Sequence, residues 1–449
     1  MNFNTDKQTL DDLTIFAKGS GDSVYGMYNR TFTRGGANIL EQMFRFPLSD
    51  VTSINIRSQI IQYFNSTDYV FPFKGSHFDQ IEQYLGNTDE RSMLAHESDT
   101  LRRTVAGVFT QDAEYKIIYK GIVSLIEIVG ELRPFMGRIK ADHSSAPYHA
   151  DMSLLSDLLA VEELEPVWKA PVKRTLPYNK VAEFDRILRF RYRNVIRKFL
   201  QYLYHLDVYM SVAKVATERK FIFPRALRKE EHTVKLKGVY HPQLKAPVPN
   251  SIHITPNANI VFLTGANMAG KSTFMKSIGI AMYVAHMGFP VAARSMEFSV
   301  RDGIYTTINL PDDLSMGASH FYAEVLRIKK VAMEMSHSKS LFIMFDELFR
   351  GTNVKDAYEG TISVTEAFAH RRNCLFILST HIVEAGEVLK EKCDNISFKY
   401  LPTRMNGNIP VYTYQVETGI TDDRHGMIII NNEGILDILK ARKTKAPLS

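Results

Sequence analysis

The residues best suited to phosphate chemistry form one run, Thr264-Gly-Ala-Asn-Met-Ala-Gly-Lys-Ser-Thr273. The G-x-x-x-x-G-K-[ST] pattern of a phosphate-binding (Walker A) loop is filled by Gly265, Gly270, Lys271 and Ser272. Glycines let successive backbone N–H groups point at one phosphate, the lysine supplies a cation, and the serine offers a hydroxyl ligand to Mg²⁺. The flanking residues predict a buried strand over 259–264 and a helix over 274–284. We therefore predict a nucleotide site rather than an ordinary glycine-rich turn.

Nucleotide hydrolysis also needs acidic residues beside the phosphate-binding loop, and a candidate pair follows a predicted strand over 341–345. This strand reads Leu-Phe-Ile-Met-Phe and ends in Asp346 and Glu347, as in a Walker B motif. We expect Asp346 to hold Mg²⁺ through water, and Glu347 to orient and deprotonate the attacking water. The alternative is that two acids merely end a core strand and face solvent.

A third short hydrophobic run, 374–378, ends in Ser379-Thr-His381. Ligands of parallel α/β sheets bind beyond the carboxyl ends of the strands. We therefore expect a polar side chain at this strand end to sense the terminal phosphate, and His381 is the candidate.

A further polar run lies between the Walker A and Walker B motifs and reads Asp312-Asp-Leu-Ser-Met-Gly-Ala-Ser-His320. Apolar residues at helical spacing follow it over 321–335. Ser319 thus caps or opens a helix, whose free N–H groups and dipole form an anion site. In ATPases that hold nucleotide between two subunits, such a loop contacts the γ-phosphate of the partner subunit. An ordinary helix cap is the alternative.

Together these motifs resemble those of the MutS family of mismatch-repair ATPases. The Walker A run is similar to the family's T-G-P-N-M-G-G-K-S-T, in which the Asn-Met pair is distinctive. Asp346-Glu347 with Arg350-Gly-Thr352 resembles D-E-x-x-R-G-T, and Ser379-Thr-His381 resembles A-T-H. His241-Pro242 and Val248-Pro-Asn250 match the H-P and V-P-N that precede the first ATPase strand.

The resemblance implies an α/β C-terminal P-loop (ABC-type) ATPase domain preceded by a mostly α-helical core and lever domain. It implies ATP and Mg²⁺ as cofactors, with Ser272 and Asp346 on the metal. Ser319 would meet the γ-phosphate of the other protomer of a dimer, His381 would act as a switch residue, and Glu347 and Asp346 complete the catalytic set. The residues that would contact the nucleotide are Gly265, Asn267, Met268, Ala269, Gly270, Lys271, Ser272, Thr273 and, by stacking on adenine, Tyr414.

The N-terminal half resembles the family more weakly, at 27–50 for the start of the core domain and at 206–216 for the returning lever. The chain also departs from the family. Ala318 and His320 flank Ser319 where Arg and Thr are usual, Phe349 replaces a small residue, and Pro247 replaces an aromatic residue that stacks on adenine. No mismatch-reading G-x-F-Y-E motif precedes residue 27. We therefore expect a short form that lacks the mismatch-reading domain.

The chain has 449 residues, 45% of them hydrophobic, which is enough for two or three domains with cores. Its two cysteines, Cys374 and Cys393, cannot form a disulfide framework and lack metal-ligand spacing. The N-terminus does not read as a signal peptide, and the uncharged stretches 246–270 and 277–293 contain proline or are too short to cross a membrane. We expect a cytoplasmic protein without membrane contact. The net charge of +6 mildly favours a polyanionic partner.

Residues 178–223 contain neither Gly nor Pro and carry apolar residues at helical spacing. One helix of that length is about 70 Å long, which suits a lever. We expect a helical core and lever domain over 1–234 and an ATPase domain over 235–449 that ends in a short helical segment at about 427–440. A solvated helix face is the alternative to DNA contact for the cations of the long helix. These cations are Arg186, Arg189, Arg191, Arg193, Arg197 and Lys198.

The leading hypothesis is an ATPase that acts as a homodimer and couples hydrolysis to the binding of DNA. The DNA would be mismatched, branched or otherwise distorted, and the process would be mismatch repair or the control of recombination. The alternative is an ATP-driven scaffold or regulator that keeps the same engine but binds a protein partner.

Overall fold

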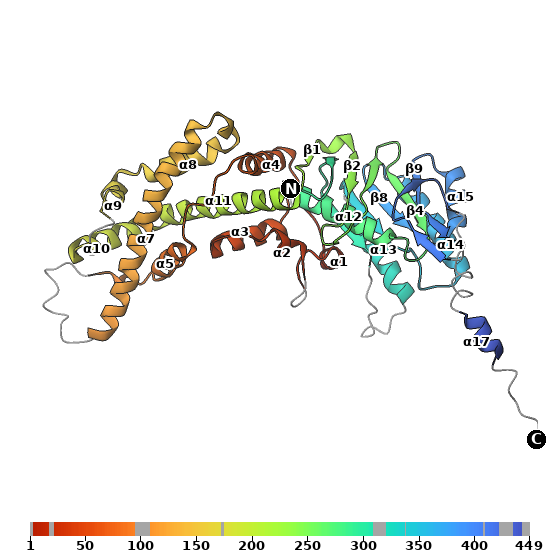
Figure 1. The fold of residues 1–449 in the computed structure, drawn as a ribbon, viewed down its shortest axis with the longest axis horizontal. Coiled ribbons are helices and arrows are strands. Elements are labelled where there is room, and N and C mark those ends of the chain that lie inside the picture. The colour runs from red at the N-terminus through yellow and green to blue at the C-terminus, as the bar shows by residue number, and fades with distance from the viewer. Residues whose placement is uncertain are drawn as a thin grey trace, which may run out of the picture. The chain divides into compact units, whose positions relative to one another are not determined.

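A computed structural model, drawn in Figure 1, describes most of the chain. The run 309–319, which contains Asp312 and Ser319, lies outside the described residues, as do residues 427–433 of the predicted C-terminal helical segment. No helix of the described part is long and apolar enough to cross a membrane. The described ranges are 3–17, 22–94, 108–171, 175–308, 320–336, 338–406, 409–421 and 434–441.

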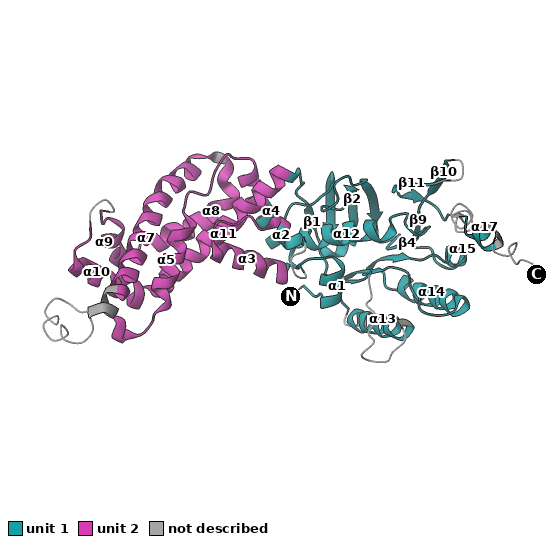
Figure 2. Ribbon diagram, turned by 60° about the horizontal axis from the view of Figure 1, so that its bottom comes forward, with its two compact units in different colours: residues 1–26, 46–58, 219–449 teal, residues 27–45, 59–218 magenta. Residues whose placement is uncertain are grey.

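The chain forms two compact units, coloured separately in Figure 2. The helical unit comprises residues 27–45 and 59–218, and the sheet unit comprises residues 1–26, 46–58 and 219–449. This division differs from the predicted boundary after residue 234. Two N-terminal segments belong to the sheet unit, and the helical unit already ends with its last long helix.

The helical unit contains only helices and connections among its described residues, in line with the helical spacing of its sequence. Helix α5 packs along α7, where Gly121 allows the close approach: a Cβ at that position would lie 2.3 Å from the Cβ of Tyr84. The α-helices are α3 (Arg34–Arg45), α5 (Gly75–Gly86), α7 (Val108–Ala141), α8 (His149–Leu159), α9 (Glu165–Trp168), α10 (Tyr178–Asp185) and α11 (Arg193–Arg219). Helices α2 (Val24–Tyr28) and α4 (Val51–Asn65) pass from one unit into the other.

A buried carboxylate fixes the turn that precedes α3. Asp207 of α11 is fully buried and accepts hydrogen bonds from the backbone N–H groups of Phe32 (3.0 Å) and Thr33 (2.9 Å). The hydroxyl groups of Thr33 and Ser211 donate to the same carboxylate, at 2.7 and 3.3 Å. Burial raises the pKa of Asp207. The four donors offset much of the cost of burying this group, so α3 and α11 are held together.

The long helix predicted over 178–223 is interrupted. A π-helical turn, η5 (Arg186–Arg191), follows α10, and α11 begins at Arg193 beyond Tyr192, whose φ is −113°. A π-turn changes which side chains of a helix face inward. In this segment the side chain of Arg189 points into the core and is 1% exposed. The run 178–223 is therefore not one uninterrupted α-helix.

The buried position of Arg189 also excludes it as a DNA contact. Its guanidinium donates to both carboxylate oxygens of Asp185, at 2.8 and 2.7 Å, and to the hydroxyl and carbonyl oxygens of Ser92, both at 3.0 Å. Arg191 pairs with an acid at 3.3 Å, and Arg193 donates to a backbone carbonyl at 2.7 Å. Of the six cations considered as DNA contacts, the exposed ones that remain without such bonds among the described contacts are Arg186, Arg197 and Lys198.

The sheet unit holds two sheets and a hairpin. The large sheet has the strand order β12-β9-β4-β8-β7-β6, and every pair in it is parallel except β12 with β9. The small sheet has the order β1-β5-β2-β3, and β10 pairs with β11. The strands are β1 (Arg225–Leu227), β2 (Val234–Val239), β3 (Asn250–Ile254), β4 (Ile260–Gly265), β5 (Ser295–Ser299), β6 (Gly303–Thr307), β7 (Leu341–Phe345), β8 (Leu375–Ser379), β9 (Ile396–Leu401), β10 (Thr403–Asn406), β11 (Ile409–Tyr412) and β12 (Glu417–Thr418).

The central strands of the large sheet, β4, β7 and β8, are buried along their whole length, as expected for parallel strands covered on both faces. They coincide within one residue with the three predicted strands. One core joins them to α13, α14 and α15 through Val331, Ile362 and Leu389. Helix α12 contacts β4, β6 and also β2 of the small sheet. The helices of this unit are α1 (Lys7–Asp12), α12 (Lys271–Ala285), α13 (His320–Ser336), α14 (Val354–Ala369), α15 (Val383–Lys392) and α17 (Ile435–Ala441).

The N-terminal segment packs against the edge of the large sheet. Asn4 bridges to Gly303 at the start of β6, and the carboxylate of Asp12 accepts from the hydroxyl of Thr306 (2.7 Å) and the N–H of Ile308 (2.9 Å). Asp6 forms an ion pair with Arg327 of α13. These contacts explain why the first residues belong to the sheet unit and not to the helical domain predicted over 1–234.

A neutral histidine lies buried where α12 ends. Nδ1 of His286 lies 2.7 Å from the carbonyl oxygen of Met282, and Nε2 accepts from the N–H of Arg301 at 2.9 Å. Because Nε2 is already an acceptor, protonation there would break a hydrogen bond inside the core. Burial lowers the pKa of His286 from its usual 6.5 to about 4.

We expect the stability of the sheet unit to fall as the pH is lowered from 7 to 5. Above pH 6.5 the histidine is neutral in both states, whereas between pH 6.5 and 4 only the unfolded chain takes up the proton. The free energy of unfolding should therefore fall by about 2 kcal/mol between pH 7 and 5 from this residue alone. Urea denaturation at both pH values measures the loss. His286→Gln should remove this component, and His370→Gln, at an exposed position, should retain it.

Candidate functional site

Three neighbouring strand ends meet at the carboxyl edge of the large sheet. β8 lies between β4 and β7, so the loop after β4 comes close to the residues that follow both other strands. Lys271 and Ser272 begin α12 directly after this loop. Asp346 and Glu347 follow β7, and His381 follows β8. Sheet order therefore brings together side chains that are far apart in the sequence.

The loop after β4 has the backbone that glycine permits. Gly265 has φ +143° and Gly270 has φ +101°, which other residues rarely adopt. A Cβ on Gly265 would also lie 3.0 Å from the carbonyl oxygen of Leu401. Met268 within the loop has φ +69° and is 78% exposed, whereas Ala269 is buried. The two predicted glycines are thus required at the bends of this loop.

The ammonium group of Lys271 lies inside the loop. Nζ donates to the carbonyl oxygens of Gly265 (2.8 Å) and Ala266 (3.3 Å), and it lies 3.5 Å from Nδ1 of His381. Burial lowers the pKa of Lys271, while Glu347 and Asp346 oppose this shift. A buried cation interacts with a nearby anion more strongly than an exposed one does, because less water screens the charge.

Asp346 joins the loop side of the site to the strand ends. The hydroxyl of Ser272 donates to Oδ2 of Asp346 at 2.5 Å, and the hydroxyl of Ser379 donates to Oδ1. Ser379 also accepts from the N–H of Glu347, at 3.0 Å through its carbonyl oxygen. The sequence placed Ser379 at a strand end but did not predict that it would hold Asp346, because β7 and β8 are adjacent only in the folded sheet.

Glu347 forms the acidic centre of the site. Its Oε1 lies 2.5 Å from Nε2 of His381, and its Oε2 lies 3.4 Å from the guanidinium of Arg350. The hydrogen bond with His381, helped by the charges of His381 and Lys271, lowers the pKa of Glu347 to about 2 against the effect of burial. The carboxylate is therefore ionised at neutral pH. The backbone of Glu347 has φ +57°, a conformation that non-glycine residues keep mainly where the surroundings enforce it.

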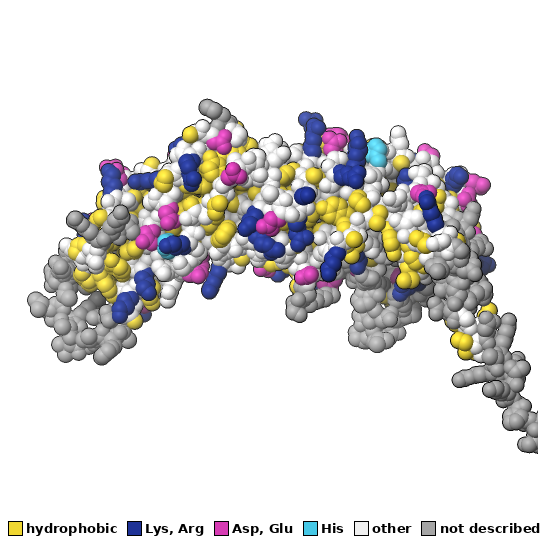
Figure 3. All heavy atoms as spheres, in the orientation of Figure 1, with side chains coloured by type: hydrophobic (Ala, Val, Ile, Leu, Met, Phe, Trp, Pro, Cys, Tyr) yellow, Lys and Arg dark blue, Asp and Glu magenta, His cyan; other side chains and the backbone are white. Residues whose placement is uncertain are grey.

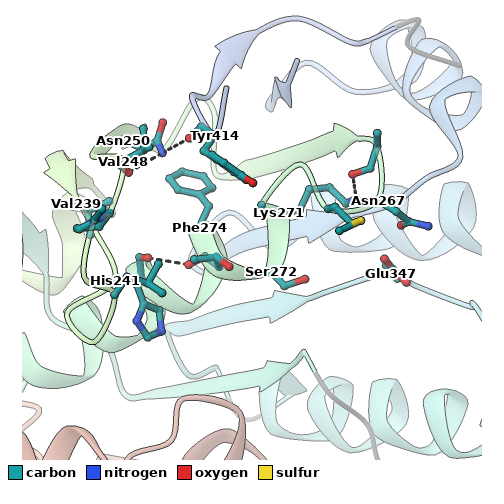
Figure 4. Close-up of a pocket in the computed structure, with 18 residues that line it drawn as sticks. Val239, His241, Val248, Asn250, Asn267, Lys271, Ser272, Phe274, Glu347 and Tyr414 are labelled. Carbon is teal, nitrogen blue, oxygen red and sulfur yellow. Dashed lines mark hydrogen bonds between the residues drawn. The ribbon is translucent and has the colours of Figure 1, made fainter. Parts of the chain in front are cut away.

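A pocket of about 430 Å³ opens beside these groups, a volume typical of sites for small ligands. Figure 4 shows Lys271, Ser272 and Glu347 at one side, and Tyr414, Phe274 and His241 at the other. One side therefore carries charge and the other offers rings and apolar surface. The predicted nucleotide residues that line the pocket are Asn267, Met268, Gly270, Lys271, Ser272, Thr273 and Tyr414.

The remaining predicted site residues are placed differently. Gly265 and Ala269 belong to the loop but do not line the pocket. Asp346 and His381 contact the lining residues Ser272 and Glu347. Ser319 lies outside the described residues. Phe349, noted as a departure from the family, is buried and packs against Gly360, where an added Cβ would lie 3.0 Å from its ring. The large side chain is thus accommodated by a glycine on α14.

Comparisons with known proteins identify relatives of this chain. The family model for MutS domain V matches residues 261–448, which contain all three strand ends. The DNA mismatch repair protein MutS of Streptococcus agalactiae serotype Ia is 28% identical over 269 residues, which cover 57% of this chain and 31% of that protein. Residues 261–448 therefore match MutS domain V, and the chain resembles proteins of the MutS family.

The similarity to MutS proteins extends beyond the ATPase motifs. The DNA mismatch repair protein MSH3 of Candida glabrata is 25% identical over 417 residues, 89% of this chain and 40% of that protein. The MutS protein of Fusobacterium nucleatum is 29% identical over 237 residues, 51% of this chain and 26% of that protein. The chain thus spans less than half the length of these MutS relatives. The resemblance to the MutS family that the motifs predicted is confirmed.

Proposed function

We propose that this chain binds and hydrolyses ATP, and that the sheet unit is a P-loop ATPase domain of the ABC type. The observation that supports this proposal most directly is the meeting of Lys271, Glu347 and His381 from three neighbouring strand ends beside one pocket. The lysine offers a cation for phosphates, the glutamate is ionised, and the pocket has room for a base. This is the set of groups that nucleotide hydrolysis requires.

Ser272 and Asp346 are the residues that would hold Mg²⁺. Their hydroxyl and carboxylate oxygens lie 2.5 Å apart, and oxygen ligands of this kind suit a hard cation that keeps several waters and phosphate oxygens. The described residues contain no cluster of three or more His, Cys, Asp or Glu with metal-site geometry. The two oxygens fit a cation whose remaining ligands are water and phosphate oxygens. Bound there, it would neutralise charge on the phosphates.

We assign water activation to Glu347. The carboxylate is ionised at neutral pH and can accept a proton, and His381 holds one of its oxygens in place. His381 also lies beside Nζ of Lys271, so it connects the phosphate-binding loop with the acid that would activate water. This position is suited to a residue that responds to the terminal phosphate.

We further propose that ATP hydrolysis is coupled to the binding of distorted or branched DNA. The support is that the relatives carry the name of DNA mismatch repair proteins and that the net charge is +6. Figure 3 shows exposed Lys and Arg side chains near β1 and β2, where Arg225, Lys235 and Lys237 are exposed. Phosphate contacts of this kind bear no sequence information, so DNA shape would decide the preference.

Gel-shift titrations with linear, G·T-mismatched and four-way DNA, with and without ATP, test this proposal. Binding should prefer the junction and weaken steeply with salt, by about 10³-fold between 50 and 200 mM if six phosphates are contacted. Arg197→Glu with Lys198→Glu should weaken all DNAs alike if that face contacts phosphates, and Lys74→Glu with Lys120→Glu is the matched control. A clear mismatch preference at physiological salt contradicts recognition by shape. ATPase activity without any DNA binding at low salt would favour the protein-scaffold alternative.

We propose a homodimer in which Ser319 of one protomer contacts the nucleotide of the other. Ser319→Ala and Lys271→Ala proteins should then each be inactive alone, because neither has an intact composite site. Mixed together, they should form hybrid dimers with one intact site and regain ATPase activity above both parents. Phosphate release from the mixture measures this, with subunit exchange verified by differently tagged chains. Activity that stays at the level of the parents despite exchange would argue against the shared site.

A further inference from the structure

One asparagine side chain holds the segment that carries Tyr414. Asn250 is the first residue of β3; its Nδ2 donates to the carbonyl oxygen of Tyr414 at 2.8 Å, and its Oδ1 accepts from the N–H of Val416 at 2.8 Å. Figure 4 marks the bond between Asn250 and Tyr414. Because one amide satisfies two backbone groups that lie two residues apart, it fixes both the position and the orientation of this turn.

The conformation of Tyr414 needs such support. Its φ is +56°, in the left-handed region that residues with a Cβ seldom adopt. Its side chain is 46% exposed, so burial of the ring contributes only part of what a core aromatic residue would gain. Backbone strain of this kind persists where neighbouring groups enforce it, and it is common at ligand sites.

The same turn brings the tyrosine ring onto the phosphate-binding loop. A Cβ on Gly270 would lie 3.0 Å from Cδ1 of Tyr414, so the ring rests against the glycine that ends the loop. Asn250, Tyr414 and Phe274 all line the pocket, on the side away from Glu347. The ring is therefore placed where the base of a nucleotide would lie if its phosphates occupied the loop.

We infer that Asn250 is a positioning residue for the nucleotide base, acting through Tyr414. The inference rests on the proposed binding of ATP. It adds a residue that contributes to recognition of the base but not to recognition of the phosphates. The amide can do this because it donates and accepts at once. An aspartate would only accept, and an alanine would do neither. Without the amide, Tyr414 loses the bonds that hold its strained backbone, and the ring leaves the base side of the pocket.

Two ligands that share the triphosphate but differ in the presence of adenosine test this role. ATP and inorganic tripolyphosphate, each with Mg²⁺, are titrated by calorimetry into the full chain and into Asn250→Ala, Tyr414→Ala and the double variant. Asn250→Ala should weaken ATP about tenfold, as expected for the loss of one or two hydrogen bonds, and change tripolyphosphate less than twofold. Added to Tyr414→Ala, it should cost no further ATP affinity. Ser251→Ala, which removes a different hydrogen bond of β3, should affect neither ligand.

The outcomes are distinct. Equal weakening of ATP and tripolyphosphate by Asn250→Ala would show a general structural role and overturn the inference. Full additivity with Tyr414→Ala would overturn it too, because Asn250 would then act independently of the ring. If the unaltered chain binds neither ligand, the proposed ATP binding itself fails.

Discussion

Glu347→Gln is expected to lower ATP hydrolysis at saturating ATP by at least about 10²-fold, because the amide cannot accept the proton of the attacking water. ATP binding should persist, since Lys271, Ser272 and Asp346 keep their positions in the loop and at the end of β7. The substitution is nearly isosteric and affects a group that is 21% exposed, so the fold should be retained. Phosphate release gives the rate, and calorimetric titration with ATP gives the affinity.

Two comparison variants make this result specific. Glu359→Gln changes an exposed glutamate of α14 in the same way and should leave the rate within twofold of the unaltered chain. Lys271→Ala should instead weaken ATP binding, since it removes the cation from the loop. A turnover of Glu347→Gln within a few-fold of normal would mean that another group activates the water.

Arg189→Ala should destabilise the helical unit by about 3–5 kcal/mol, because it leaves the fully buried carboxylate of Asp185 without its cation. The loss includes both hydrogen bonds to Ser92 and the packing of the guanidinium over the rings of Tyr84 and Phe190, at 5.6 and 4.7 Å. Urea denaturation followed by far-UV circular dichroism measures this change in the free energy of unfolding.

The neighbouring arginine provides the control. Arg186 is exposed on the same π-helical turn, so Arg186→Ala should change stability by less than about 0.5 kcal/mol. Asp185→Asn in the Arg189→Ala chain should recover part of the loss, since it removes the unpaired charge. If Arg189→Ala is as stable as the unaltered chain but binds DNA more weakly, the side chain faces DNA and not the core.

The motifs at the strand ends could be predicted because their chemistry is local. Fully apolar runs of five or six residues form buried parallel strands, and the glycines of the loop are set by backbone conformation alone. β4, β7 and β8 were therefore located within one residue, and the acids and the histidine after β7 and β8 were identified with them. The resemblance to the MutS family followed from the order of these motifs.

Pairings between distant segments could not be predicted in this way. Ser379 bonds to Asp346 because β8 lies beside β7, and Asn250 bonds to the turn of Tyr414 across 164 residues of chain. The hydrogen bonds of such residues are decided by strand order and loop path, and their own sequence neighbourhoods carry no sign of them.

The sequence by itself thus determined which residues carry charge, cradle phosphate or end a strand, because those properties depend on residue type and short-range spacing. Only the tertiary structure decided which faces are buried. Arg189 reads as one cation in a basic run, but it is buried, pairs with Asp185 and donates to Ser92, which lies 97 residues away. The first residues read as the start of a helical domain, but Asp6 and Asp12 bind to α13 and β6. A charged side chain is buried only where a partner stabilises it. That partner can lie about 300 residues away in the sequence, and a one-residue change of helical register alters which side chains face it. The local sequence pattern therefore does not decide which charged residues are buried.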